Sequence, residues 1–367
     1  MRKVLVCGAA FAATCISAVA APGGALAKAP EPTPTAVPSP PAASPGLPGT
    51  PSATGTPTAP GTPDQASPTA AATGSPAGPA QDRAGAPDPV VSTRAVMVTP
   101  RPPKVLTYAY GKHPRQRMDA YWRAGTPAQA RGQAPRPAVL VLHGGSWLTG
   151  DKSSWKYFAR RLTAQGYTVF SANYRLATQA AWPAQRDDAV SAVEFIKKNA
   201  ARWNIDPNRV VAIGSSAGGL LASQLGTYGD GASRVRGVLA LSPVNTPYLA
   251  YQDGAKADAT PGKRYLRRAV VDLVRCVPSE SDPACWQRVE DADASSHVTA
   301  TDAPMLLMHA TDELVPPTHS TGLAAALRGV GVPATVKVVP GKMHASELLN
   351  DPSVYPAILS WLKARTR

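Results

Sequence analysis

Cysteine is scarce in this chain, with only four among 367 residues, and two of the four lie at positions 7 and 15. Paired cysteines at the spacing of a zinc site are therefore excluded, and no other cluster of metal ligands at such a spacing occurs. We predict that the protein uses neither a metal ion nor an organic cofactor.

Aromatic side chains are absent from residues 28–103, where proline, alanine, threonine, serine and glycine dominate. Such a segment cannot bury enough apolar surface to offset the chain entropy lost on folding. We predict that residues 28–103 are a disordered linker, which serves either as a stalk through a cell envelope or as a plain linker or propeptide. All tryptophans and tyrosines lie in residues 104–367, where we predict one folded domain.

The amino terminus lacks an apolar run of the length and strength that a membrane span needs, about 20 residues. Arg2 and Lys3 precede an alanine-rich apolar run over residues 4–21, and Ala-Leu-Ala at residues 25–27 places small residues where a signal peptidase reads them. We predict a cleaved secretory signal peptide over residues 1–27 rather than a membrane anchor. The mature protein would then be secreted or associated with the cell envelope, with no transmembrane span.

Export would leave Cys276 and Cys285 as the two cysteines of the mature chain. In an oxidising compartment two such residues are expected to pair, so we predict a disulfide between them. It would close a loop of about ten residues and contribute roughly 2–3 kcal/mol through the lost entropy of the unfolded chain. Its predicted role is structural.

Acidic residues are the minority charge, with 24 Asp and Glu against 38 Lys and Arg, which gives a net charge of +14. A basic protein is attracted to nucleic acids or to anionic surfaces. The sequence has no cluster of Lys and Arg with interleaved aromatic residues, so we predict no nucleic-acid partner. For an exported chain, the charge favours association with the anionic polymers or lipids of a cell envelope.

After residue 104 the sequence alternates between short β-branched runs and longer helical patterns, which is typical of an α/β fold with a mostly parallel sheet. The predicted strands cover residues 105–110, 117–121, 138–142, 167–171, 210–213, 235–241, 305–309 and 334–339. The predicted helices cover residues 154–165, 185–201, 220–226, 323–327 and 355–363. We expect the first two strands to form a hairpin at the sheet edge and the third to be central and buried on both faces.

Two stretches depart from this alternation. Residues 204–207, Asn-Ile-Asp-Pro, predict a turn. Between residues 246 and 300 the apolar pattern loosens, and we predict a small, lid-like helical excursion over the strand ends, closed by the cysteine pair. In open α/β sheets ligands bind outside the carboxyl ends of the strands, so an excursion there would shape a pocket. The alternative is a surface loop without a role.

A nucleophile motif directly follows the predicted strand 210–213. Residues 214–218 read Gly-Ser-Ser-Ala-Gly, which fits the pattern G-x-S-x-G of a tight turn between a strand and a helix. Glycines are needed at both ends of the motif because larger side chains would clash in the turn. We predict that Ser216 is a nucleophile, held on the floor of a pocket by a strained backbone, and weigh this against a structural turn.

A second motif, His-Gly-Gly-Ser-Trp at residues 143–147, follows the predicted central strand, where an oxyanion loop is expected. Its small residues let the backbone approach a substrate, and the N–H group of Ala217 is the expected partner donor. We interpret His143 as a structural hydrogen-bonding residue of the loop and Trp147 as a candidate lining residue of the substrate pocket.

The base and the acid are sought among the residues that follow Ser216, because nucleophile, acid and base occur in that order along the chain in this class of site. Of six histidines, His344 follows the last predicted strand and His319 is the rival. For the acid, Asp312 lies just beyond the strand that ends at residue 309, and Glu313 is the neighbour that could replace it. We predict that Ser216, Asp312 and His344 form a triad.

These motifs resemble the esterase and lipase branch of the α/β hydrolases related to hormone-sensitive lipase, and more closely its feruloyl-esterase-like members with an HGGxW loop. The segments that carry the resemblance are residues 110–122, 143–151, 173–176, 182–188, 206–219 and 309–316. The resemblance implies the same triad, with Gly145, Ser146 and Ala217 as oxyanion donors. The chain departs from the pattern in reading Gly-Gly-Ser for three glycines and Gly-Ser-Ser for Gly-Asp-Ser, and in lacking a large amino-terminal cap. We interpret Arg175 and Asp188 as a structural pair.

The expected function is hydrolysis of carboxylic esters through an acyl-enzyme, with a small ester of a short acyl or aryl group as substrate. Two alternatives stay open at this point. The same triad could transfer acyl groups or cleave peptides, and the fold could also serve as a non-catalytic, envelope-bound interaction protein.

Overall fold

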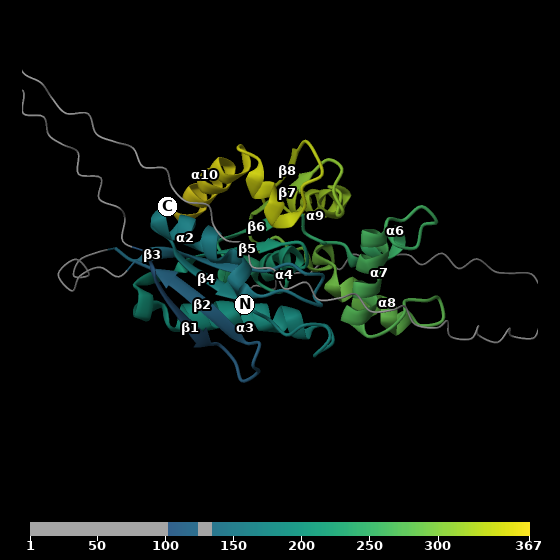
Figure 1. The fold of residues 1–367 in the computed structure, drawn as a ribbon, viewed down its shortest axis with the longest axis horizontal. Coiled ribbons are helices and arrows are strands. Elements are labelled where there is room, and N and C mark those ends of the chain that lie inside the picture. The colour runs from purple at the N-terminus through teal and green to yellow at the C-terminus, as the bar shows by residue number, and fades with distance from the viewer. Residues whose placement is uncertain (1–101, 124–133) are drawn as a thin grey trace, which may run out of the picture. The chain divides into compact units, whose positions relative to one another are not determined.

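An eight-stranded sheet organises the part of the chain that the computed structural model describes, residues 102–123 and 134–367 (Figure 1). Both ranges belong to one compact unit, Val91–Arg367. The predicted signal peptide over residues 1–27 and nearly all of the predicted linker over residues 28–103 lie outside the described residues.

The strands of the sheet lie in the order β1-β2-β4-β3-β5-β6-β7-β8. Their bounds are β1 Lys104–Ala109, β2 Arg117–Trp122, β3 Arg136–Leu142, β4 Thr168–Ala172, β5 Ile205–Ser215, β6 Gly237–Leu241, β7 Met305–Ala310 and β8 Ala334–Val339. β2 pairs antiparallel with both β1 and β4, and every other pairing is parallel. The predicted edge hairpin and the mostly parallel sheet are confirmed.

Helices connect the strands and cover the sheet. Their bounds are α2 Lys156–Ala164, α3 Ala184–Lys198, α4 Ala217–Thr227, α5 Gly231–Arg234, α6 Pro247–Asp253, α7 Pro261–Val274, α8 Pro283–Ala292, α9 Thr318–Gly329 and α10 Val354–Thr366. Short 3₁₀ segments are η1 Lys152–Trp155, η2 Ala200–Trp203, η3 Ala294–His297 and η4 Ala345–Asn350. Among the residues described, no helix combines the length and the apolarity that crossing a membrane requires.

Side chains of the central strands alternate between two apolar layers. Val139 and Val141 of β3 pack in the layer with α2 and α10, whereas Leu140 and Leu142 pack in the layer with α3, α4 and α9. Figure 1 shows α2 and α10 on one side of the strands and α3 on the other. All four side chains are fully buried, as expected for a parallel strand covered by helices on both faces.

The predicted turn over residues 204–207 is confirmed only at Asn204, because residues 205–207 belong to a strand. Asn204 adopts a left-handed conformation at the end of η2, and β5 begins at the next residue, where Ile205 pairs with Arg136. The register then shifts, because the following pair joins Ala138 to Val210. Residues 205–207 therefore belong to an irregular start of β5, where the partner strand supplies pairing that the sequence pattern does not reveal.

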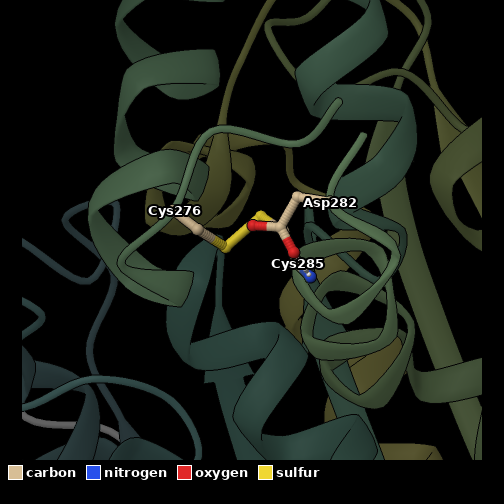
Figure 2. Close-up of side chains that lie close together, drawn as sticks. All are labelled: Cys276, Asp282 and Cys285. Carbon is tan, nitrogen blue, oxygen red and sulfur yellow. Dashed lines mark hydrogen bonds between the residues drawn. A yellow bond between two sulfur atoms is a disulfide. The ribbon is translucent and has the colours of Figure 1, made fainter. Parts of the chain in front are cut away.

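The predicted excursion corresponds to α6, α7, α8 and η3, and the three helices gather in one group beyond the sheet (Figure 1). A disulfide joins Cys276, which follows α7, to Cys285 of α8 (Figure 2). The Asp282 carboxylate lies beside the two sulfur atoms and accepts a hydrogen bond from the backbone N–H of Cys285 at 3.0 Å. With both sulfur atoms in a disulfide and the carboxylate capping α8, this group offers a metal no thiolate ligand.

Candidate active site

Ser216 occupies the sharp junction between β5 and α4. Its backbone has φ 50° and ψ −120°, a conformation that residues with a side chain rarely adopt, and its N–H donates to the carbonyl of Leu241 at 2.8 Å. A Cβ on Gly214 would lie 2.0 Å from the Gly218 carbonyl oxygen, and one on Gly218 would lie 2.3 Å from that of His143. Backbone surrounds both positions, which explains why the elbow needs glycine at each end.

His344 lies between Ser216 and a carboxylate. Its Nε2 atom is 3.0 Å from Ser216 Oγ, and its Nδ1 atom is 2.6 Å from Oε2 of Glu313. When Nδ1 carries the proton and donates it to Glu313, Nε2 is free to accept the hydroxyl proton of Ser216. The structure thus brings Ser216 and His344 together in the arrangement of a nucleophile and its base.

The predicted acid, Asp312, does not take part in this arrangement, and Glu313 stands in its place. Asp312 is exposed, and its backbone N–H donates to the Gly341 carbonyl at 2.9 Å. The side chain of the next residue, Glu313, points toward His344 instead. Its Oε1 atom accepts a hydrogen bond from the backbone N–H of Ala310 at 2.9 Å. This local turn after β7 decides which of two neighbouring carboxylates faces His344, and residue type alone did not reveal it.

Hydrogen bonds hold the Glu313 carboxylate in its charged form. Glu313 is only 7% exposed, and this burial by itself raises the pKa of its side chain. Hydrogen bonds from His309, His344 and Ser242 outweigh the effect of burial and lower the pKa to about 2. Glu313 is therefore ionised at neutral pH, as the partner of a histidine that gains a proton must be.

We expect Glu313 to make the folding stability depend on acidity. Its folded pKa of about 2 lies below the ordinary value of 4.5, so the stabilisation is fully present above pH 4.5 and is lost as the pH falls toward 2. The difference corresponds to about 3 kcal/mol. Urea unfolding between pH 2 and 6 should show that, as the pH falls, the unfolding free energy decreases more steeply in the wild type than in Glu313→Gln. Equal slopes would contradict the assignment of this carboxylate as the charged group.

Ser242 and Glu347 hold the loop that carries His344, and the sequence analysis did not identify either of them. The N–H of Ala345 donates to Oγ of Ser242 at 2.8 Å, and the N–H of His344 donates to Glu347 at 3.2 Å. Ser242 follows β6 with a positive φ of 47°, so it turns out of the sheet toward this loop. No local motif marks Ser242, because its role depends on strands that are distant in sequence.

The predicted oxyanion loop packs directly on the elbow. A Cβ on Gly144 would lie 3.1 Å from the Ser215 carbonyl oxygen, and Gly145 has φ 110°. The Gly145 carbonyl accepts hydrogen bonds from the N–H groups of Leu148 and Thr149, so the N–H of Ser146, across the same planar peptide, points the opposite way. Ala217 begins α4, where the backbone N–H has no partner within the helix.

His143 has the structural role that the sequence predicts. Arg115 donates to Nε2 of His143 at 3.1 Å, which leaves Nδ1 to donate to the Gly144 carbonyl at 2.8 Å. The ring stacks on Tyr174 with 4.4 Å between ring centres. Burial lowers the pKa of His143 to about 4, so the ring is neutral and holds the oxyanion loop in place.

Trp147 does not line the pocket and instead lies fully buried in the core. Ser146 and Trp147 both have positive φ values, 52° and 58°, and this reversal of the chain turns the indole ring inward. The prediction of Trp147 as a pocket residue is therefore wrong. The aromatic side chains that line the cavity within the described residues are Trp155 and Tyr265.

A cavity of about 450 Å³ opens beside Ser216 and His344. The oxyanion loop forms one wall through Gly144, Gly145 and Ser146. Tyr265 of α7, which is half-exposed, and Leu314 form a further part of the wall. The excursion therefore contributes directly to the pocket.

The remaining charged and titratable candidates are structural. Arg175 and Asp188 form an ion pair at 2.7 Å with the carboxylate fully buried, which confirms the predicted pairing. His319, the rival base, is buried in α9 and does not line the cavity, and burial lowers its pKa to about 4. His344 is thus the histidine that contacts Ser216.

A serine, a carboxylate and a histidine at the carboxyl ends of a mostly parallel sheet, in this order along the chain, are the arrangement of the α/β-hydrolase class. Residues 126–245 match the model of BD-FAE, a family of hormone-sensitive-lipase-like α/β-hydrolase esterases. The resemblance that the sequence motifs predict is confirmed.

Curated relatives and solved structures agree with this class. Esterase LipC of Mycobacterium tuberculosis is 27% identical over 261 residues, covering 67% of this chain and 61% of the relative. The probable isoprenylcysteine alpha-carbonyl methylesterase ICMEL1 of Arabidopsis thaliana is 26% identical over 254 residues, covering 66% and 51%. The chain thus spans about half to three-fifths of the length of these relatives.

Two solved structures share the fold. Esterase B from Lactobacillus Rhamnosis has a TM-score of 0.59 at 22% identity, covering 72% of this chain and 86% of its own. The thermophilic esterase Est2 from Thermogutta terrifontis has a TM-score of 0.54 at 19% identity, covering 71% and 90%. At these identities the likeness supports the α/β-hydrolase fold.

Proposed function

We propose that this protein is a serine esterase that hydrolyses carboxylic esters through an acyl-enzyme, with Ser216, His344 and Glu313 as its triad. One observation carries the proposal: His344 contacts Ser216 Oγ at 3.0 Å and Glu313 at 2.6 Å with its two ring nitrogens. Two of the curated relatives, LipC and LipM of Mycobacterium tuberculosis, are named as an esterase and a probable carboxylic ester hydrolase, which supports the same reaction.

Acylation begins when Ser216 Oγ attacks the ester carbonyl and His344 Nε2 takes the hydroxyl proton. The ionised Glu313 stabilises the imidazolium that forms. Backbone N–H groups stabilise the negative charge on the carbonyl oxygen by donating hydrogen bonds to it. The candidate donors are Ala217, Ser146 and Gly145. The tetrahedral intermediate then collapses, and His344 returns the proton to the departing alcohol.

Deacylation repeats these steps with water. His344 removes a proton from a water molecule, which attacks the acyl carbonyl, and the same imidazolium then protonates Ser216 Oγ as the acid leaves. The bond between Ser216 and the acyl group breaks, so the enzyme is restored with no metal or organic cofactor in any step.

The size and lining of the cavity support small substrates. About 450 Å³ accommodates a short acyl or aryl ester, and Trp155, Tyr265 and Leu314 offer it an apolar wall. Acyl transfer and peptide cleavage use the same chemistry, so they are outcomes of the test below.

The test combines substrate profiling with active-site labelling. We expect nitrophenyl esters from acetate to palmitate to be hydrolysed fastest at the short end, with feruloyl and acetyl-xylan substrates in parallel. A fluorophosphonate probe should add to Ser216, as mapped by peptide mass spectrometry. An unlabelled, inactive protein would indicate a non-catalytic role, and alkyl ester products in the presence of an added alcohol would indicate acyl transfer.

Export is the second element of the proposal and is supported by the sequence alone. The basic amino terminus, the apolar run and the Ala-Leu-Ala site suggest release after residue 27, and the net charge of +14 favours the surface of an anionic envelope. Expression of the full chain in a secreting bacterium should give a protein outside the cytoplasm that begins at Lys28. A cell-retained protein with its initiating methionine would contradict export.

A further inference from the structure

The carboxylate of Glu313 is shared by two histidines. Its Oε2 atom faces His344, while its Oε1 atom lies 3.2 Å from Nδ1 of His309 and accepts from the N–H of Ala310 at 2.9 Å. His309 lies in β7 and is fully buried, so it contacts no substrate directly. His309 is not among the residues that line the active-site cavity.

A chain of buried polar groups continues behind His309. Its Nε2 atom is 2.7 Å from Oγ of Ser320, and Ser320 Oγ in turn accepts from the side-chain amide of Asn245 at 3.2 Å. Ser320 and Asn245 are both fully buried. His319 also faces this region as a further titratable group, and burial lowers its pKa to about 4.

The hydrogen-bond donors of this chain define the tautomer of His309. Ser320 Oγ already accepts from Asn245, so its own proton has a partner among the described contacts only if Nε2 of His309 accepts it. The ring proton then lies on Nδ1, which faces two acceptors, Glu313 Oε1 at 3.2 Å and the Val315 carbonyl at 2.9 Å. His309 is neutral in this arrangement, and its N–H group points at the carboxylate.

We propose that His309 is a positioning residue for the triad: through its neutral Nδ1–H form it holds the Glu313 carboxylate in the orientation that reaches His344. The proposal rests on the proposed function. It explains how the long side chain of a glutamate serves as the acid, because Oε1 is held by Ala310 and His309 while Oε2 is presented to the base. Neutrality matters because a charged His309 would compete with the His344 imidazolium for the same negative charge.

Two substitutions distinguish the contributions of the two ring nitrogens of His309. The side-chain amide nitrogen of asparagine takes the place of Nδ1, so His309→Asn retains a donor to Glu313 and loses the contact with Ser320. The longer His309→Gln can place its amide oxygen at the position of Nε2, so it retains an acceptor for the Ser320 hydroxyl and loses the donor to Glu313. His297→Gln is the matched control, because His297 contacts the Asp291 carbonyl outside the active site.

We expect His309→Gln to lower kcat by about 10- to 100-fold with little change in KM, the effect of one lost hydrogen bond to a charged group. His309→Asn should retain most of kcat, and His297→Gln should match the wild type. The low-field proton resonance of His344 Nδ1, observed by NMR in the resting protein, should move in His309→Gln and stay in His309→Asn. Circular dichroism and urea unfolding establish that each variant is folded.

Three results would overturn the proposal. Wild-type kcat and an unmoved resonance in His309→Gln would remove the positioning role. If both variants lose kcat equally, in proportion to their loss of unfolding free energy, His309 is a packing residue. If ¹⁵N chemical shifts show His309 protonated on both nitrogens at pH 7, the neutral form is wrong. The resonance needs no turnover, so it tests His309 even if the wild type proves inactive, in which case the proposed function fails separately.

Discussion

Ser216→Ala should lower kcat for a short nitrophenyl ester by about a millionfold, the loss typical of removing the nucleophile of a triad. The alanine removes the atom that forms the acyl-enzyme, while the elbow, the oxyanion loop and the cavity stay in place. KM of any residual reaction should therefore change little. Steady-state kinetics on purified protein, with fluorophosphonate labelling as a second readout, measures the effect.

Ser223→Ala provides the matched control for this variant. Ser223 lies two turns further along α4, and its buried hydroxyl makes no hydrogen bond within the described residues. Its removal should leave kcat within about twofold of the wild type, as for a substitution that touches no reacting group. Full turnover in Ser216→Ala would place the nucleophile elsewhere and refute the proposed mechanism.

Glu313→Gln should lower kcat by about 10⁴-fold, whereas Asp312→Asn should leave it within about twofold of the wild type. The glutamine amide can donate to Nδ1 of His344, which favours the tautomer with its proton on Nε2. That tautomer cannot accept the proton of Ser216. The exposed Asp312 makes no contact with His344, so its charge is dispensable for the reaction.

The pair of variants distinguishes the two neighbouring carboxylates directly. Both substitutions remove one negative charge at adjacent positions, so the change in net charge is the same. Measured kcat values with a large loss in Asp312→Asn and a small one in Glu313→Gln would restore the acid predicted from the sequence. Similar modest losses in both would show that His344 works without a dedicated carboxylate.

The sheet and the nucleophile were predictable because their signals are local. The strand at residues 138–142 is a continuous apolar run, and the structure buries it on both faces. The motif at residues 214–218 combines a buried strand, two glycines and a helix, and the structure places Ser216 at their junction with a strained backbone. Each feature depends on residues within a few positions of one another.

The acid, the pocket wall and the supporting histidine were not predictable in this way. Asp312 and Glu313 are adjacent and chemically alike, and the hydrogen bonds of Ala310 and Asp312 decide which one turns inward. Trp147 lies in a motif next to the site, but the left-handed backbone at residues 146 and 147 turns its ring into the core. Tyr265 lies next to the apolar stripe of the amphipathic α7, and only the packing of that helix beyond the sheet brings its ring to the cavity.

The amino-acid sequence by itself determined the α/β architecture, the position of the strained serine and the histidine that follows the last strand, because short-range periodicity and turn chemistry encode them. Only the tertiary structure decided that Glu313 is the carboxylate at His344, that His309 holds its other oxygen and that α7 lines the cavity. These features depend on the directions in which side chains leave elements that are distant in sequence. Such directions are set by packing across the whole sheet.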